Sequence, residues 1–474
     1  MKASGLSAAR RRLSELDAAE IAFQQQLIRG AIAARQLKST AAALTPATPA
    51  AVEPIAEAGV FEAAVYRNEA LRLGEELWNA AIRDRKGRPE WLGMDLGADG
   101  ESFHFGLIGN SLYSGSSGIA LLFARLAVAS EGEAAQSWRK RAWACFEGLA
   151  ERNSNDQLFR LVRDLPIGIS GTGGTLLTLL LLQRAGLTQA TPLVERLVQQ
   201  LRPERLSADE GIDVIGGISG LLGSLLRVGD RRTLDLATVC GDRLLELQQD
   251  NGGWSVGAVS SLRRPPLTGF SHGAAGMAAA LARLAQATGA QRFANGAQRA
   301  VAYERSVFDT ERGNWPDFRS SNDANEFMLS WCHGAPGILL SRLVLEASGL
   351  GDAAMEAERQ VARQSTLAVL DEIAATRHDY AAHLCCGALG LTSLLQIDAQ
   401  LSGVPLSPRV SAAESKVISN AIANGGYTFF SVDTGSLNLP GLYTGKAGVA
   451  LALLEAGNGQ QSMPAVLSAG LLLP

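Results

Sequence analysis

Five side chains that can bind a metal ion occupy two neighbouring positions of a pattern that recurs along the chain. The pattern is Gly-x-x-Gly leading straight into an apolar run, and it occurs seven times. The residues directly before its first glycine are Ser114, Ser170, Ser219, His272, His333, Cys386 and Thr444. One position earlier stand Tyr113, Ile169, Ile218, Ser271, Cys332, Cys385 and Tyr443. Thiols and imidazoles are ligand types that zinc prefers, and three protein ligands leave a fourth position free for a substrate.

Taken one at a time, these side chains are weak evidence for a metal site. A single Cys-His or Cys-Cys dipeptide is often structural, because free cysteine is commonly a small core residue. The shared register adds what one dipeptide lacks: if every copy lies at the same height, copies four, five and six bring their ligands together. Those ligands are His272, Cys332, His333, Cys385 and Cys386. The register therefore predicts a zinc site at one mouth of a ring of repeats.

The repeat also predicts the elements that position these residues. Its copies are 49 to 61 residues apart and begin at Gly115, Gly171, Gly220, Gly273, Gly334, Gly387 and Gly445. Such a period is typical of a repeat architecture, in which each unit buries its apolar face against its neighbours. The glycines let the backbone turn tightly at the start of a helix and let neighbouring helices approach closely.

Each repeat predicts one inner and one outer helix. The runs after the glycines, such as residues 119–124, are apolar nearly all round and indicate buried helices. The intervening segments, such as residues 137–152 and 291–308, mix charged and apolar residues and suit an outer layer. Cys145 and Cys240 fall in segments of this outer type, and we interpret both as structural. We therefore expect an all-α fold, an α/α toroid (barrel) of seven helical hairpins; an open solenoid is the alternative.

The N-terminal part of the chain lacks the repeat. Residues 1–45 have a helical pattern, residues 45–54 are rich in Ala, Pro and Thr, and residues 61–83 predict another helix that faces a core. We therefore divide the chain into an N-terminal helical arm with an Ala/Pro-rich linker at residues 1–60, and a toroid domain at residues 61–474.

The composition excludes several classes of protein. With 47% hydrophobic and 19% charged residues the chain is globular, and a net charge of −4 gives no basic surface for nucleic acid. The N-terminus has no apolar signal segment, and the five cysteines indicate reduced thiols. Residues 165–182 carry no charge but contain a proline and four glycines, so we interpret them as a buried helix start and expect no transmembrane segment.

Several motifs resemble those of one family. Residues 330–337 (SWCHGAPG) and 383–387 (HLCCG) are similar to the zinc motifs of the lanthionine synthetase C-like (LanC-like) cyclases. Residues 269–273 (GFSHG), 213–220 (DVIGGISG) and 251–254 (NGGW) match further motifs of that family. The likeness covers roughly residues 110–450. The lead-in at residues 112–115 (LYSG) most resembles the C-terminal cyclase domain of class II (LanM-type) lanthipeptide synthetases.

The resemblance implies a ligand set. It assigns zinc to Cys332, Cys385 and Cys386, where most of the family has Cys-His in the second motif. Three thiolates occur in a subset of the class II enzymes. Zn²⁺ with three thiolates carries a net charge of −1, so it withdraws less electron density from a fourth thiolate, and we expect a bound substrate thiolate to be more nucleophilic.

The resemblance also implies a reaction. The family adds a cysteine thiol of a dehydrated precursor peptide (leader and core) to dehydroalanine or dehydrobutyrine and so closes a thioether ring. His272 is our candidate general acid/base, because imidazole titrates near neutral pH. Asp213 either orients His272 or takes the thiol proton. A helix cap is the structural alternative for Asp213, and a core histidine for His272.

Other side chains near the register have smaller predicted roles. His333, Tyr113 and Tyr443 are candidates for the substrate pocket. We predict no role for His104, His378 and His383.

The length before the repeat implies that dehydration occurs elsewhere. We expect a separate dehydratase, or a chain split or excised from a bifunctional synthetase. We also expect a cytoplasmic protein, free or peripheral to a membrane-bound biosynthetic complex. Two other functions stay open: a non-catalytic LanC-like scaffold that binds peptides or thiols, and a terpene-cyclase-like α/α toroid, suggested by residues 248–254 (QQDNGGW).

Overall fold

The computed structural model describes residues 4–39, 60–96, 103–151, 157–158, 165–255, 265–319, 327–375, 380–430, 437–459 and 461–472. The predicted linker at residues 45–54 lies outside the described residues, and so does His378. The division of the chain at residue 60 therefore stays a prediction.

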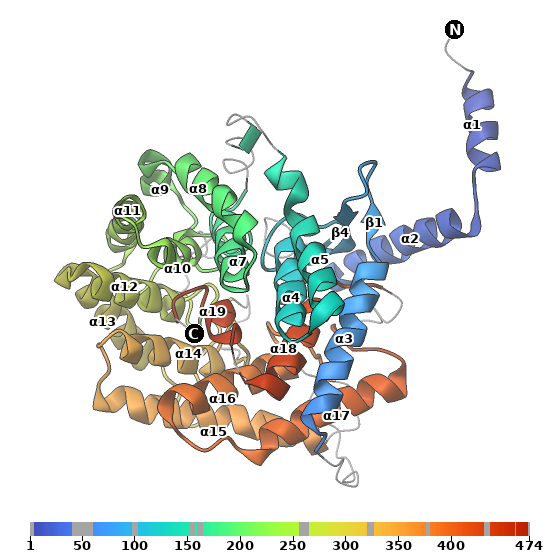
Figure 1. Ribbon diagram of the computed structural model, residues 1–474. Helices are drawn as coiled ribbons and strands as arrows, with labels where there is room; N and C mark the ends of the chain where they lie inside the picture. The colour runs from blue at the N-terminus through green and yellow to red at the C-terminus, as the bar shows by residue number, and fades with distance from the viewer. Residues whose placement is uncertain are drawn as a thin grey trace.

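Seven apolar helices form the inner layer of a closed ring (Figure 1). They are α4 (Ser116–Val128), α7 (Thr172–Arg184), α10 (Ile218–Val228), α12 (Ala274–Thr288), α14 (Ala335–Ala347), α16 (Ala388–Ser402) and α18 (Lys446–Asn458). Each contacts the next, and α18 contacts α4. Nearly all their side chains are buried, because each inner helix faces the centre of the ring on one side and the outer layer on the other.

The second glycine of the pattern permits close packing of an inner helix on its own loop, as the sixth and seventh copies show. A Cβ at Gly390 would lie 1.9 Å from the Leu384 carbonyl oxygen, and one at Gly448 would lie 1.8 Å from that of Leu442. Such distances are impossible for any residue with a side chain. The glycine spacing therefore follows from this contact.

The outer layer completes the seven hairpins. Six outer helices follow their inner partners in sequence: α5 (Gly132–Ala150), α8 (Thr191–Gln200), α11 (Arg231–Leu247), α13 (Gln291–Ser306), α15 (Ala353–Ala375) and α17 (Pro408–Asn424). A 3₁₀ turn (Thr188–Ala190) precedes α8, and the short α9 (Pro203–Ala208) follows it and packs on α11. The partner of α18 is α3 (Ala63–Asn79), from the other end of the chain. This confirms the predicted α/α toroid.

Short strands follow α3, where the sequence predicted a helix to residue 83. β1 (Ile82–Arg83) pairs with β2 (Pro89–Glu90), and β3 (Leu92–Leu96) pairs with β4 (Phe103–Leu107), both antiparallel. The chain turns because Asp84 accepts hydrogen bonds from the N–H groups of Lys86 and Arg88, and Gly87 adopts a φ of +79°.

The N-terminal helices extend from this side of the ring. α1 (Gly5–Ser14) has no buried residue and projects away from the body in Figure 1. α2 (Ala18–Ser39) packs on β4, where a Cβ at Gly30 would lie 2.1 Å from the Phe105 ring. The glycine is therefore what allows α2 to approach the strand.

The end of the described chain fills the centre of the ring. Residues 462–472, here called the C-terminal plug, include α19 (Met463–Leu467) and are all buried. The Trp331 indole donates to the Leu467 carbonyl (2.8 Å), and Arg227 Nε donates to that of Gly470 (3.0 Å). Since Trp331 precedes α14 and Arg227 lies on α10, the plug connects different sides of the ring.

None of the described helices combines the length and the apolar character needed to cross a bilayer. The uncharged stretch at residues 165–182 leads into α7, whose residues are buried inside the ring. This confirms the interpretation of that stretch as a buried helix start.

Candidate metal centre

The loops in front of the inner helices are joined into a belt around one mouth of the ring. Backbone N–H groups donate to carbonyl oxygens of the neighbouring loop at Leu112–Ile169 (3.2 Å), Ile169–Val214 (3.1 Å), Val214–Ser271 (3.0 Å), Phe270–Cys332 (3.0 Å), Cys385–Tyr443 (2.9 Å) and Tyr443–Tyr113 (2.9 Å). Among the described residues, only the joint between the fifth and sixth loops has no such bond. The belt is therefore open between Cys332 and Cys385.

The three thiols occupy this open joint. The Sγ atoms of Cys332, Cys385 and Cys386 all lie within 4.8 Å of one another. Cys332 Sγ is 3.3 Å from Cys386 Sγ, which is 3.4 Å from Cys385 Sγ. Cys332 and Cys385 are buried, whereas Cys386 is partly accessible.

The donor set fits a zinc ion. Zinc binds thiolates at about 2.3 Å in a tetrahedron, which separates two sulfur ligands by roughly 3.8 Å. Two of the sulfur separations here are 3.3 and 3.4 Å and the third is at most 4.8 Å, so small side-chain adjustments are enough for all three to bind one ion. Soft thiolates select zinc over Mg²⁺ or Ca²⁺.

Each of the three cysteines has a polar neighbour, which contacts the sulfur of Cys385 and of Cys332 and the backbone of Cys386. The Tyr113 hydroxyl donates to Cys385 Sγ at 3.1 Å, and the Ser330 hydroxyl lies 3.1 Å from Cys332 Sγ. The Cys386 N–H donates to Nδ1 of the buried His383 at 3.2 Å. Burial lowers the pKa of His383 to about 4, which keeps this ring a neutral acceptor.

The three thiols ionise unequally. Hydrogen bonds from Cys385 and Cys386 lower the pKa of the Cys332 thiol well below its usual value. The same hydrogen bonds to Cys332 raise the pKa of Cys385 and of Cys386. A bound cation would favour the thiolate form of all three.

A histidine and a carboxylate lie beside the thiols. Ser271 Oγ and the Ser271 N–H both contact the Cys332 carbonyl, so the loop that carries His272 is joined to the loop of Cys332. His272 Nδ1 is 2.6 Å from Asp213 Oδ2, while Asp213 Oδ1 accepts the N–H groups of Gly216 and Gly217. An ionised carboxylate accepts only, so Nδ1 carries the proton and Nε2 is the acceptor.

His333 packs behind His272. The two rings lie 6.0 Å apart and nearly parallel, and His333 is fully buried with Nδ1 3.9 Å from Asp317 Oδ1. Burial, together with the positive charge of Arg319, lowers the pKa of His333 to about 4, so the ring is neutral at physiological pH. Arg319 in turn pairs with Asp317 at 2.6 Å.

Comparisons with known proteins agree with this architecture. A family model described as "Lanthionine synthetase C-like protein" matches residues 107–468. The chain belongs to the lanthionine synthetase C-like family. This confirms the resemblance to the LanC-like family, and the finer likeness to class II cyclase domains stays a prediction. A search of curated proteins finds no significant match.

Solved structures show the LanC-like fold. The nisin cyclase matches with a TM-score of 0.58 and 18% identity, over 87% of this chain and 99% of that one. At that identity the likeness shows a common fold alone. The unsaturated glucuronyl hydrolase from Bacillus sp. GL1 has a TM-score of 0.42 and 15% identity over 67% of this chain and 85% of that one, which is too distant to inform function.

The two tyrosines that are predicted to line the substrate pocket lie at different depths. Tyr113 is half-buried, whereas Tyr443 is fully buried behind it, with the rings stacked at 4.8 Å. The Tyr443 hydroxyl donates to the Val466 carbonyl of the C-terminal plug at 2.6 Å. Burial, followed by the charges of Cys385 and Cys386, raises the pKa of Tyr113 and keeps its hydroxyl a donor. A pocket role for Tyr113, Tyr443 and His333 stays a prediction.

Some residues of the site carried no signal in the sequence. Asp317 and Arg319 lie before the fifth copy of the pattern, outside any shared register. His383 precedes the Cys-Cys pair and was predicted to have no role, yet it fixes the Cys386 backbone. His104 lies on β4, where its side chain is exposed.

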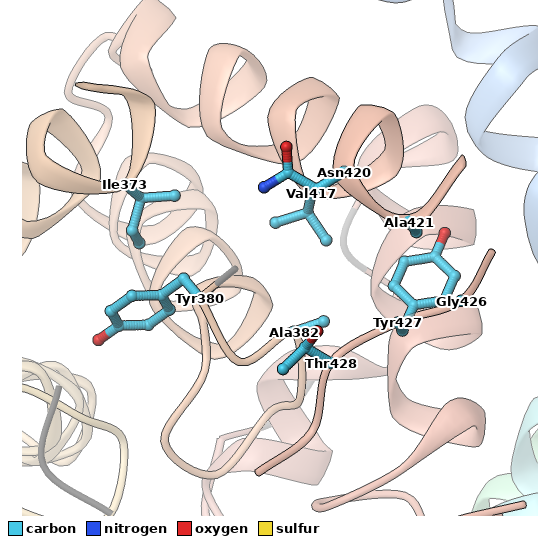
Figure 2. A pocket seen from close by; sticks show the side chains of 9 residues that line it. All are labelled: Ile373, Tyr380, Ala382, Val417, Asn420, Ala421, Gly426, Tyr427 and Thr428. Atoms are coloured by element: carbon cyan, nitrogen blue, oxygen red, sulfur yellow. The ribbon is translucent and has the colours of Figure 1, made fainter. Parts of the chain in front are cut away.

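A hollow of about 280 Å³, counting space open to solvent, lies near the sixth loop (Figure 2). It is lined by Ile373, Tyr380, Ala382, Val417, Asn420, Ala421, Gly426, Tyr427 and Thr428. Burial raises the pKa of the Tyr380 phenol, and negative charge at Cys386 raises it further. In Figure 2 the Tyr380 hydroxyl points away from the hollow.

Proposed function

We propose that this LanC-like protein is a zinc-dependent lanthipeptide cyclase, which adds cysteine thiols of a dehydrated precursor peptide to dehydroalanine or dehydrobutyrine. The observation that supports this most strongly is the gathering of three thiols from two repeats at the open joint of the belt. Family membership and the neighbouring His272–Asp213 pair are consistent with it. Cys332, Cys385 and Cys386 are the proposed zinc ligands.

The reaction needs a thiolate at neutral pH, whereas a free cysteine thiol has a pKa near 8.5. Bound zinc supplies the Lewis acidity that favours the thiolate and fixes its sulfur. The partly accessible Cys386 marks the side from which a peptide approaches. The buried Cys332 and Cys385 keep the ligand sphere closed to water on the other side.

His272 and Asp213 are proposed to manage the proton. His272 Nε2 takes the proton that the substrate thiol loses, the substrate sulfur forms a bond to the β-carbon as the C=C π bond breaks, and the α-carbon receives a proton from His272 Nε2. Asp213 holds His272 with Nδ1 protonated, so that Nε2 faces the peptide. The two backbone bonds to Asp213 Oδ1 fix the carboxylate and make it a positioning residue.

The dehydrated peptide is proposed to come from another protein. A separate dehydratase, acting on Ser and Thr of the precursor, is the class of enzyme that would supply this substrate. The three-cysteine ligand set is the feature that favours kinship with the class II cyclase domains.

A ring-closure assay with a metal measurement tests the proposal. The substrate is a synthetic peptide with one dehydroalanine and one cysteine, and the loss of free thiol is followed with and without a chelator. We expect one zinc per chain and ring closure that stops on chelation and in Cys385→Ala. Cys145→Ala, which removes a thiol on the outer helix α5, is the matched control and should react like the parent.

Other results would contradict specific parts. Ring closure at the parent rate by Cys385→Ala would refute the ligand assignment. Zinc bound by the three thiols without any ring closure would favour a thiol-binding scaffold instead.

A further inference from the structure

Tyr113 contacts the thiol cluster although it lies far from the cysteines in the sequence. It belongs to the first copy of the pattern and Cys385 to the sixth, yet the Tyr113 hydroxyl donates a hydrogen bond to Cys385 Sγ at 3.1 Å. A hydroxyl that donates to a sulfur withdraws negative charge from it, and partners of this kind tune metal ligands.

One residue holds both partners of this bond in place. The Tyr443 N–H donates to the Tyr113 carbonyl, and the Tyr443 carbonyl accepts the Cys385 N–H, each at 2.9 Å. The Tyr113 and Tyr443 rings stack with 14° between their planes. Tyr443 itself is anchored through its hydroxyl to Val466 and by the packing of Trp331 on its ring. The contact from Tyr113 to Cys385 is therefore fixed by backbone bonds and by packing on both sides.

The other buried thiol has a similar neighbour. The Ser330 hydroxyl lies 3.1 Å from Cys332 Sγ and accepts the His333 N–H at 3.2 Å. By contrast, the side-chain neighbours of Cys386 Sγ are the other two thiols. The two buried sulfurs thus each have a hydroxyl at hydrogen-bond distance, whereas within the described part of the chain no hydroxyl hydrogen-bonds to the accessible sulfur.

This arrangement matters because of charge. Three thiolates on a divalent cation give a net charge of −1, and a substrate thiolate makes it −2. All four sulfurs then compete to donate electron density to the same ion. A protein sulfur that gives part of its density to a hydroxyl donates less to the metal.

We propose that Tyr113 is a positioning residue that weakens Cys385 as an electron donor, so that the substrate sulfur is the most nucleophilic sulfur on the ion. This inference rests on the proposed function for the identity of the substrate thiol. It assigns Tyr113 to the ligand set itself, where the register predicted only a pocket residue.

The test is the spectrum of the protein with cobalt(II) in place of zinc. The near-ultraviolet charge-transfer band of a cobalt thiolate moves to longer wavelength when a sulfur loses a hydrogen bond. Tyr113→Phe keeps the stacked ring and removes the hydroxyl, so we expect a band at longer wavelength with unchanged cobalt content. Ring closure by its zinc form should be about 10-fold slower.

Tyr443→Phe is the matched control for the spectrum. It removes a phenol hydroxyl from the same stack, but that hydroxyl contacts a carbonyl and not a sulfur. We expect its band to coincide with that of the parent. A 3-fluorotyrosine at position 113 is a stronger donor and should move the band to shorter wavelength, which tests the same bond if the phenylalanine variant does not fold.

Two results would overturn the inference. One is a Tyr113→Phe band identical to the parent band at equal cobalt content. The other is an equal shift in Tyr443→Phe, which would place the effect in the aromatic stack. A shift in Tyr113→Phe alone, in a protein that closes no ring, would support the positioning role and contradict the proposed cyclase activity.

Discussion

Asp213 determines the protonation of His272 through a single oxygen. Oδ2 accepts from His272 Nδ1, and Oδ1 is held by two backbone N–H groups. Asp213→Asn places an amide N–H opposite Nδ1 and so favours the wrong tautomer. We expect ring closure about 100-fold slower, the lower range of general acid/base contributions, with zinc content unchanged.

Asp209→Asn is the control for that variant. Asp209 lies in the same loop and accepts the Gly211 N–H, but it does not contact His272. It should react at the parent rate. Equal slowing in both variants would show that the loop, and not the tautomer, limits the reaction.

Glu414 makes stability depend on pH. It is buried on α17 and accepts from Gln396 Nε2 at 3.0 Å, and burial raises its pKa from 4.5 to about 7. The native state keeps a proton that the unfolded state releases, so between these values stability falls as pH rises. Glu414→Gln should therefore unfold like the parent near pH 4.

Above pH 7 the same variant should be more stable than the parent, by up to about 3 kcal/mol. Urea unfolding at pH 4 and pH 8 measures the difference. A constant difference between the two proteins across this range would contradict the role of Glu414 ionisation.

For single residues, the sequence predicted which positions form the site better than it predicted their contacts. The register identified Cys332, Cys385 and Cys386, because they stand one or two positions before the glycine pattern that the helix packing requires. It had no means of finding Arg319 or Asp317, which reach the site from a loop without a repeat. His383 was predicted to have no role, because its acceptor function depends on loop geometry.

At the scale of elements, the metal is expected to close the belt. Among the residues that the structure describes, six joints between neighbouring loops have backbone bonds, whereas the joint between the loops of α14 and α16 has the three thiols in their place. Removal of zinc should therefore loosen this joint first. We expect amide hydrogen exchange at residues 328–334 and 380–387 to become about 10-fold faster, or more, in chelated protein.

The joint between the loops of α10 and α12 is the internal control. The Val214 N–H there donates to the Ser271 carbonyl at 3.0 Å, without any thiol. Its exchange should not change on chelation. Uniformly faster exchange would indicate global destabilisation and contradict a local role for the metal.

The inner helices and the helix α3 were predictable, but the pairing of α3 with α18 was not. A helix that is apolar on all sides must be buried, so the local sequence pattern was sufficient to predict the inner layer. The pairing of α3 with α18 joins the two ends of the chain, and amphipathic periodicity states that a face is buried without naming its partner. The strands after α3 depend on a turn at Asp84 and Gly87, a signal that the helical pattern obscured.

At the scale of the whole molecule, the C-terminal plug is expected to stabilise the ring. Leu467 is fully buried, and its carbonyl accepts from Trp331. Leu467→Ala should lower the free energy of unfolding by about 2–5 kcal/mol, the usual loss for a buried leucine. Urea unfolding measures it. Leu406→Ala, at a leucine that is 43% exposed, is the control and should change stability by less than about 0.5 kcal/mol.

If Leu467→Ala and Leu406→Ala changed the free energy of unfolding equally, the plug would not stabilise the ring. The sequence did not predict the plug, since residues 462–472 carry no copy of the pattern. Their burial depends on a central space that exists only once seven hairpins have assembled.

The pairing of α3 with α18 has a consequence for biosynthesis. α3, which buries Leu73 and Leu77, leaves the ribosome before the six other hairpins, but α18, on which it packs, is translated after them. Contacts so distant along a polypeptide form slowly. We expect the nascent chain to expose this apolar stripe throughout translation, and a chaperone that shields it to determine how much protein reaches the closed ring.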